Sequence, residues 1–214
     1  MSVKNCTKRA PKGRPRADEV QARAEKLLDV ATEVFLESGF ERAKVADIVR
    51  RAGASKSSIY SRYPTKKALF EAVISRKITQ LDQQMADSLS SSQSIPVMLK
   101  SFGLSLFETV FSLELRSLFK VVISEASSFP ELAENFWQAG PKYTVYALAA
   151  VLSDNQDFTA DNSVQAADFF ISMCIGTPLL KANLRPDFIF SEEEIHTRLN
   201  HAIDIFTSVY TSVG

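Results

Sequence analysis

The spacing of the apolar residues constrains the fold of this chain more than any other feature, because along nearly its whole length they recur at every third or fourth position. This spacing gathers apolar side chains on one face of an α-helix. No segment shows the alternation of apolar and polar residues that is typical of a strand bounded by hairpin turns. We therefore predict an all-α protein. Helices are expected over residues 18–38, 45–52, 56–63, 66–81, 98–115, 116–127, 131–152, 164–182 and 192–211.

The composition indicates a globular chain without a membrane span. Of the 214 residues, 45% are hydrophobic and 23% are charged, and the longest apolar run, 145–152, is far shorter than the ~20 residues that cross a bilayer. Asp18 and Glu19 stand where a secretory signal needs apolar residues, so a cytoplasmic protein is expected. Cys6 and Cys174 are isolated, without the Cys or Cys/His spacing of a disulfide framework or a zinc site.

Charge is distributed unequally, although the net charge is zero. Residues 1–80 contain 18 Lys and Arg against 9 Asp and Glu, whereas residues 81–214 contain 7 against 16. The first sixteen residues are basic and contain no acid, which is compatible with a solvated tail or with an arm that grips nucleic acid. Arg14 and Arg16, on an extended Gly/Pro backbone, would suit the narrow minor groove of A·T-rich DNA.

Two short expected helices, 45–52 and 56–63, are joined by a three-residue turn that contains Gly53, and this is the arrangement of a helix-turn-helix. Ser55 can cap the second helix through its hydroxyl, and Pro64 ends it. The small and polar residues Ser57 and Ser58 at its start suit entry into a major groove. The Ser-rich stretch 86–96 reads as a connection between units. We expect a basic arm over 1–17, a DNA-binding domain over 18–80 and a second helical domain over 81–214.

The same residues resemble the N-terminal DNA-binding domain of the TetR/AcrR family of bacterial transcriptional regulators over roughly residues 20–75. The resemblance is carried by Gly39-Phe40 and by the stretches 45–49, 52–60 and 63–70. It implies that 56–63 is the recognition helix, that Tyr60 contacts the DNA backbone and that Lys66 binds a phosphate. The expected DNA-binding residues are Arg14, Arg16, Lys44, Ser55, Lys56, Ser57, Ser58, Tyr60, Arg62, Tyr63 and Lys66.

Three positions depart from the family pattern, which often has a hydroxyl residue at Lys44, Gly at Ser57 and His at Arg62. A lysine cannot accept hydrogen bonds as a helix cap, although its charge can reach a phosphate. The guanidinium of Arg62 can bind a phosphate or a guanine edge with two hydrogen bonds, which an imidazole cannot do. The operator sequence therefore cannot be inferred from the operators of related proteins.

The acidic second half is rich in aromatic residues, with twelve of the fifteen Phe and the only Trp. Residues 116–126 and 129–133 resemble the C-terminal domain of the AefR-like branch, which implies a domain that binds an effector and forms dimers. Each aromatic residue alone is more simply core, but together they allow an apolar ligand pocket inside a helix bundle. The expected pocket residues are Phe102, Phe119, Phe136, Trp137 and Tyr143.

The last two expected helices have wide apolar faces, which either close the core of the domain or form a four-helix interface between two copies. A dimer would let two readers bind two half-sites related by two-fold symmetry. The expected interface residues are Phe170, Ile171, Ile175, Leu199, Ile203 and Phe206.

The sequence contains no motif of an enzyme or a cofactor site, since GxSxG, P-loop, GxGxxG and HExxH are all missing. The two histidines, His196 and His201, do not have the i, i+4 spacing of a metal-binding pair. We therefore predict a cytoplasmic, homodimeric, ligand-responsive transcriptional regulator without a cofactor, which binds double-stranded operator DNA as a repressor and is released by a small, largely apolar effector. Two alternatives stay open. One is a helical small-molecule-binding protein or enzyme with a degenerate DNA-binding head, and the other is an architectural DNA binder with little sequence preference.

Overall fold

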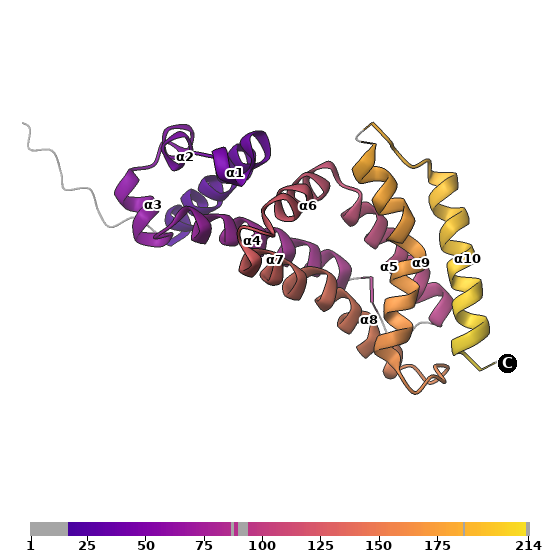
Figure 1. Cartoon of the computed structure of the whole chain (residues 1–214). Helices are drawn as coiled ribbons and strands as arrows, with labels where there is room; N and C mark the ends of the chain where they lie inside the picture. Colours follow the sequence, from indigo (N-terminus) through magenta and orange to yellow (C-terminus); the bar gives the residue numbers. More distant parts are fainter. Residues whose placement is uncertain (1–16, 87, 90–93, 186, 213–214) are drawn as a thin grey trace, which may run out of the picture.

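The computed structural model describes residues 17–86, 88–89, 94–185 and 187–212, and these residues form helices joined by loops (Figure 1). Within these ranges the one β-type pairing is an isolated antiparallel bridge between Phe158 and Thr211. The all-α prediction is confirmed. The helices are α1 (Ala17–Arg42), α2 (Val45–Ala52), α3 (Lys56–Arg62), α4 (Lys66–Ala86), α5 (Ile95–Val110), α6 (Leu113–Glu125), α7 (Pro130–Trp137), α8 (Tyr143–Ser153), α9 (Ser163–Leu184) and α10 (Glu192–Tyr210), with a π-helical turn, η1 (Gln138–Lys142), between α7 and α8.

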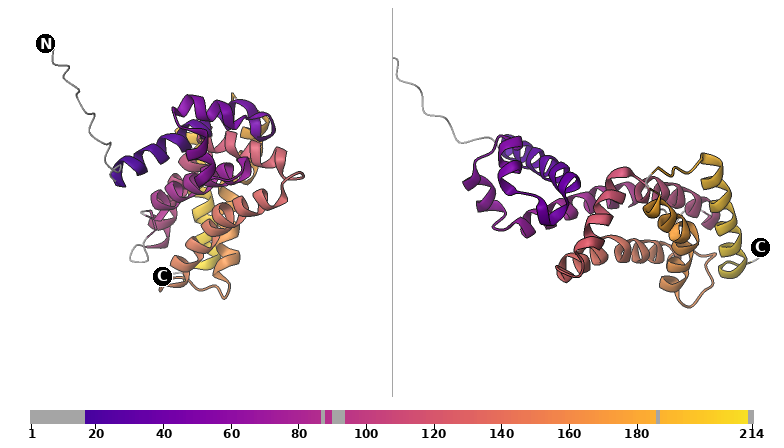
Figure 2. Two further views of the ribbon diagram at one scale, coloured as in Figure 1. Left: turned by 90° about the vertical axis from the view of Figure 1, so that its left-hand side faces the viewer. Right: turned by 45° about the horizontal axis from the view of Figure 1, so that its top comes forward.

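The described chain is elongated, with α1–α3 at one end and α9 and α10 at the other (Figure 1, Figure 2). α4 runs from the first group toward the second, and α6 and α7 lie between them. The short α2 and α3 are therefore far from the last two helices, and they project from the body of the molecule.

Two helix predictions are wrong in their extent, each because of a local signal. The helix expected over 98–115 is divided, since α5 ends at Val110 and the Ser112 hydroxyl accepts a hydrogen bond from the Leu115 N–H at 3.2 Å, which caps α6. The helix expected over 131–152 is interrupted by η1, which contains Pro141. Proline has no N–H to donate, and a π turn accommodates this loss without ending the helical path.

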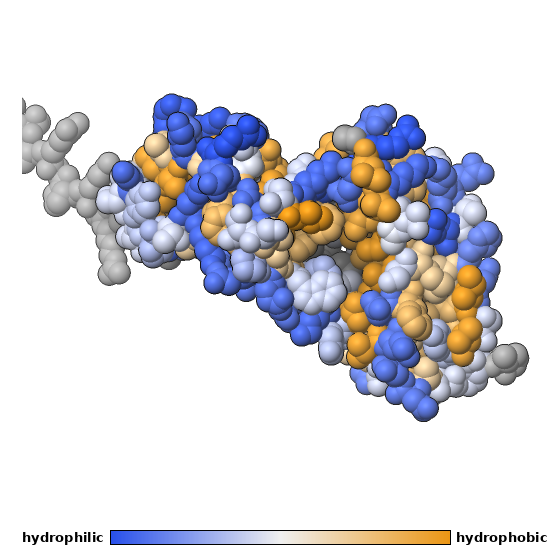
Figure 3. Space-filling model, in the orientation of Figure 1, coloured by the Kyte–Doolittle hydropathy of each residue, from blue (hydrophilic) through white to orange (hydrophobic). Residues whose placement is uncertain are grey.

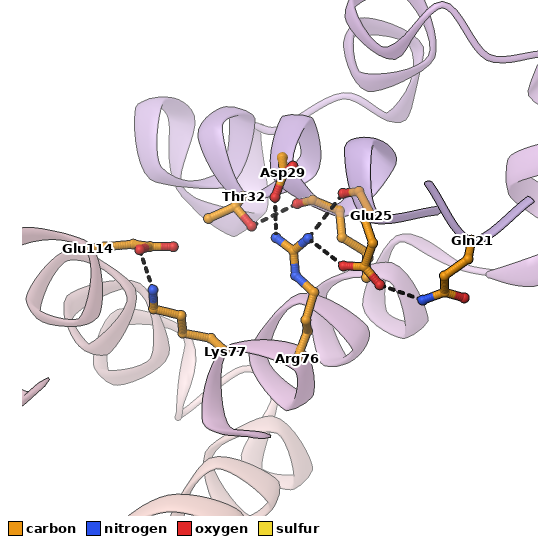
Figure 4. A network of polar contacts seen from close by, with 8 residues as sticks. Gln21, Glu25, Asp29, Thr32, Arg76, Lys77 and Glu114 are labelled. Atoms are coloured by element: carbon orange, nitrogen blue, oxygen red, sulfur yellow. Dashed lines mark hydrogen bonds and ion pairs between the residues drawn. The ribbon is translucent and has the colours of Figure 1, made fainter. Parts of the chain in front are cut away.

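Arg76 of α4 binds α4 to α1 through polar contacts (Figure 4). Its guanidinium donates to the carbonyl of Glu25 at 3.0 Å and to the carboxylate of the same residue at 3.2 Å, and it lies 2.8 Å from the carboxylate of Asp29. Lys77, the next residue, forms an ion pair with Glu114 of α6. These contacts place α4 between the N-terminal helices and the second part of the chain.

The buried apolar residues form two clusters. The first joins α1–α4 to α6 and α7: the rings of Phe35 and Phe70 are 4.7 Å apart, and Phe40 lies 4.8 Å from Phe129, just before α7. The second fills the space among α5, α8, α9 and α10. Because the first cluster includes residues of α6 and α7, the N-terminal helices share a core with these two helices. In addition, α4 continues past residue 80, which was expected to be the end of the first domain.

Among the described residues α9 is the one helix long and apolar enough to cross a membrane, whereas no such segment was expected from the sequence. It is also a core helix, because Ala166, Phe170 and Cys174 are buried. Its outward side keeps apolar residues, among them Phe169, which is 47% exposed. α9 therefore has two apolar faces, one packed in the core of the chain and one exposed on its surface.

Candidate functional site

The turn between α2 and α3 is built by Gly53 and Ser55. Gly53 adopts φ 63°, ψ 27°, a left-handed conformation that other L-residues rarely adopt, and the N–H of Ala54 then donates to the carbonyl of Val49 at 3.2 Å. The Ser55 hydroxyl accepts a hydrogen bond from the Ser58 N–H at 3.1 Å and caps α3, as predicted. These local contacts fix the angle between the two short helices.

α3 is fixed to the body by one side and presents the other side to solvent. Ile59 is 1% exposed and packs in the first core cluster together with Ile48 of α2. Ser57, Ser58 and Tyr60 are exposed. We call those exposed side chains of this helix and its cap that are predicted to contact DNA the α3 edge. The α3 edge consists of Ser55, Lys56, Ser57, Ser58, Tyr60 and Arg62.

The α3 edge carries two cations and one accessible phenol. The Lys56 ammonium lies 5.8 Å from the centre of the Tyr60 ring, so the two side chains share one patch. Tyr63, also predicted to contact DNA, is half-buried and packs against the first core cluster. Within the described residues, no carboxylate forms an ion pair with Lys56 or Arg62. Both cations are therefore available to an anionic partner.

Two further predicted contacts lie beside the α3 edge. Lys44 is exposed at the start of α2 and makes no side-chain capping bond, as expected from its chemistry. Lys66 is half-buried, and its ammonium donates to the carbonyl of Glu41 at 2.8 Å and to that of Ala43 at 3.3 Å. An ammonium has three donors, so one remains for the phosphate contact that the sequence predicts. Arg14 and Arg16 lie outside the described residues.

The arginines of α2 are already paired with acids. Arg50 lies 2.9 Å from Asp47, and Arg51 lies 2.8 Å from Glu37 of α1. The hydrogen bond from Arg51 lowers the pKa of the Glu37 carboxyl. These pairs neutralise part of the positive charge behind the α3 edge, which leaves Lys56 and Arg62 as its unpaired cations.

A second candidate site is a cavity of about 310 Å³ among α4, α5, α6, α7, α8 and α9. A hollow between α6 and α9 is visible on the surface (Figure 3). Of the five residues expected at a ligand pocket, Phe119, Phe136 and Trp137 line this cavity. The other two expected pocket residues, Phe102 and Tyr143, are not part of its lining, and Phe102 is fully buried in the second core cluster.

Sequence reasoning missed the most unusual residue of the cavity wall, Arg116. It is 6% exposed and stands among apolar side chains near the start of α6. The sequence signal is a basic residue flanked by the apolar Leu115 and Leu118, but periodicity alone does not identify a cavity. Ile171 and Ile175, predicted as interface residues, also line the cavity.

The outer face of α9 and α10 is apolar in its middle and polar toward one end. Apolar residues gather over both helices in Figure 3. Phe169, Ile205 and Val209 are exposed there, and with Met173 they line a depression of about 410 Å³. The expected interface residues Phe170, Ile171, Leu199, Ile203 and Phe206 are buried in the core of the same chain.

The described residues contain no group of three or more potential metal ligands. His196 and His201 are both exposed, as expected for surface residues. Cys174 is buried, and burial raises the pKa of its thiol to about 12.

Both parts of the chain match families of known proteins. The family of bacterial regulatory proteins of the tetR type matches residues 27–73, and the C-terminal domain of AefR-like transcriptional repressors matches residues 97–212. The uncharacterized HTH-type transcriptional regulator YvdT of Bacillus subtilis is 35% identical over 66 residues, which are 30% of this chain and 34% of that protein. The HTH-type transcriptional repressor ComR of Escherichia coli is 34% identical over 73 residues, which are 34% of this chain and 32% of that protein. The chain thus matches about a third of the length of each of these relatives.

Solved structures share the fold over most of the chain. A TetR-family transcriptional regulator from Mesorhizobium loti superposes with a TM-score of 0.83 and 20% identity, covering 90% of this chain and 98% of that one. The flavonoid-responsive regulator FrrA gives a TM-score of 0.79 with 23% identity, covering 91% of this chain and 100% of that one. The matched proteins are transcriptional regulators and not enzymes. With a helix-turn-helix at one end, an AefR-like helical domain at the other and both family models matched, the chain belongs to the TetR family of bacterial transcriptional regulators.

Proposed function

We propose that the protein is a cytoplasmic, homodimeric repressor that binds operator DNA through the α3 edge and is released by a small effector bound in the cavity. The observation that carries this proposal is the α3 edge itself. A short helix is capped by Ser55, fixed from behind by Ile59 and lined on its free side with small, polar and cationic side chains. A helix of this kind can enter a major groove and present donors and acceptors to base edges.

The state of the head argues against a degenerate DNA-binding domain. The left-handed turn at Gly53, the Ser55 cap and the buried Ile48 and Ile59 are all intact. A head that had lost its function would be free to lose these features as well. Arg14 and Arg16 stay part of the proposal as a minor-groove arm, on the basis of their charge and sequence.

The proposed release by an effector is supported by the helices that the cavity shares with the head. Ile78 of α4 lines the cavity, and α4 also begins beside the α3 edge. Phe119 of α6 lines the cavity, while Leu118 and Val122 of the same helix pack in the first core cluster. A ligand that moves α4 or α6 therefore acts on the support of the head. Such coupling is reciprocal, so an effector that weakens operator binding must itself bind the operator complex less well.

The proposed dimer uses the outer face of α9 and α10. Regulators of this family act as dimers. The exposed Phe169, Ile205 and Val209 supply an apolar centre, and Arg198, His201 and Glu193 supply polar groups along the adjoining groove. An apolar centre with a polar border is typical of a protein interface. This face replaces the buried residues that the sequence analysis expected.

The proposed function is tested by selection from a random pool of double-stranded oligonucleotides with the purified full chain. We expect an enriched motif with two half-sites related by two-fold symmetry, because a dimer presents two copies of α3. Binding without any enriched motif would favour the architectural alternative and reject a sequence-specific repressor. Absence of binding at low salt would favour the degenerate head.

A further inference from the structure

Arg116 is a buried cation in the wall of an apolar cavity, and no acid pairs with it. Its side chain is 6% exposed. One terminal nitrogen donates to the carbonyl of Ala182 and lies 3.5 Å from that of Arg185, but the Nε has no hydrogen-bond partner. Across the described residues no carboxylate lies within ion-pair distance of this guanidinium.

The carbonyl contacts explain only part of the position of Arg116. Ala182 is in the last turn of α9, and the negative end of a helix stabilises a nearby cation. Carbonyls are neutral, however, and an unpaired donor and an unpaired charge are costly when buried. A residue whose only task was to cap α9 would not need to border a cavity. Arg116 thus lines the cavity with a charge that no acid of the described residues neutralises.

The rest of the cavity defines the body of such a ligand. Phe119, Phe136 and Trp137 supply aromatic walls, and the volume of about 310 Å³ is at the lower end of the range for small-molecule sites. Asp168 also lines the cavity, fourteen residues before Ala182 along α9, and is exposed. At the helical rise Asp168 lies about 20 Å along the helix axis from Ala182, whose carbonyl accepts from Arg116. Asp168 disfavours a second negative charge at that far end.

We propose that the effector is a small organic carboxylate with one negative charge and an aliphatic or aromatic body, whose carboxylate binds the Arg116 guanidinium while its body fills the cavity. The proposal rests on the cavity being the effector site of the proposed repressor. A carboxylate matches the planar donors of a guanidinium. Arg116 lies on α6, whose Leu118 and Val121 pack in the core shared with the head, so the ligand contacts an element that supports the head.

The test compares carboxylates with their neutral amides. Decanoate and 2-naphthoate, and the primary amide of each, are titrated into the full chain at pH 7 while the fluorescence of Trp137 is recorded. Trp137 is the only tryptophan and lines the cavity, so its signal reports on this site. We expect at least one of the carboxylates to bind at least about tenfold more tightly than its amide, because a charge-assisted hydrogen bond is lost in the amide.

Variants separate a direct role of Arg116 from a structural one. Arg116→Gln should bring the affinity of the preferred carboxylate to within about twofold of its amide. Arg116→Lys keeps the charge and should keep a reduced preference, and it serves in place of the Gln variant if that variant does not fold. Lys120→Gln, on the same helix and outside the cavity lining, is the matched control and should leave the preference unchanged.

Three results would overturn the proposal: amides that bind as tightly as the carboxylates, a preference that survives in Arg116→Gln, or no carboxylate binding below about 1 mM. These measurements do not involve DNA. If the random-pool selection yields a motif while the carboxylates fail, the repressor stands and only the ligand class is rejected. If the carboxylates bind while no motif is enriched, the ligand class stands and the sequence-specific repressor is rejected.

Discussion

Lys66 and Lys67 are neighbours at the start of α4 with different environments. The Lys66 ammonium donates to two carbonyls of the α1–α2 segment and lies 4.7 Å from the centre of the Phe40 ring. Lys67 pairs with Glu131, whose side chain is 72% exposed. Lys66 therefore supports the head from inside, whereas Lys67 forms a solvent-exposed ion pair.

We expect Lys66→Met to lower the free energy of unfolding by about 1–2 kcal/mol, because two carbonyls lose a charged donor. Lys67→Met should cost less than about 1 kcal/mol, as is usual for an exposed ion pair. Urea denaturation of both variants gives the comparison. Equal losses, or a larger loss for Lys67→Met, would contradict the role given to Lys66.

Cys174 offers a residue-scale test of the second core. Its thiol is fully buried, and burial raises its pKa to about 12, so almost no thiolate exists at neutral pH. The thiolate is the reactive form. In a Cys6→Ser variant we expect no thiol to react with a disulfide reagent at pH 8 in the native protein, and one to react in denaturant. Rapid reaction of the native variant would mean that α9 is more open than described.

At the scale of elements, the turn between α2 and α3 depends on the left-handed conformation of Gly53. A Cβ at this position would meet no atom within 4 Å, so the cost of a substitution is conformational and not steric. We expect Gly53→Ala to destabilise the protein by about 1 kcal/mol, because alanine resists this conformation. It should also weaken DNA binding, since the angle between α2 and α3 is set there.

Gly176→Ala is the matched control for this variant. Gly176 lies within α9 without a positive φ, and a Cβ there would also meet no atom within 4 Å. Alanine is the better helix former, so stability should stay the same or rise. Thermal denaturation of the two variants provides the measurement. A Gly53→Ala protein as stable as Gly176→Ala would show that the turn is not under this constraint.

Local signals made the N-terminal helices predictable. The Ser55 cap, the stop at Gly53 and the cap by Thr65, whose hydroxyl accepts from the Ala68 N–H at 3.0 Å, depend on residues a few positions apart. The same kind of signal at Ser112 does not stand out in the sequence, because the apolar spacing continues across the break. Periodicity indicates that a helix exists, whereas its ends depend on single side chains.

The tertiary placement of the last helices could not be derived in this way. α9 and α10 carry apolar residues on two sides, and spacing does not say which side turns inward. Phe170 and Leu199 are fully buried in the chain's own core, while Phe169 and Ile205 face outward. The cavity was likewise only partly predicted, since an aromatic residue such as Phe102 can fill space as well as line it.

At the scale of the whole molecule, dimerisation through α9 and α10 is the feature most open to test. Ile205 is 55% exposed near the centre of the proposed interface. We expect Ile205→Glu to convert a dimer to a monomer in sedimentation at micromolar concentration, because an unpaired charge would be buried in the interface. Operator affinity should fall with it.

Ile123→Glu is the control for the dimer prediction. Ile123 is 57% exposed, but it lies on α6, away from the α9–α10 face. This variant should remain dimeric. A wild-type protein that sediments as a monomer, or an Ile205→Glu protein that stays dimeric, would exclude the proposed interface.

The central claim is that the α3 edge reads base sequence, and its most direct measurement is the ratio of affinities for a selected duplex and a scrambled one at one fixed salt concentration. The wild-type ratio should reach about 10³ or more. Lys56→Ala/Ser57→Ala should reduce it at least about tenfold, since base contacts are lost, whereas Tyr60→Phe should weaken both duplexes alike. A ratio that is unchanged in the Lys56→Ala/Ser57→Ala protein would contradict the claim.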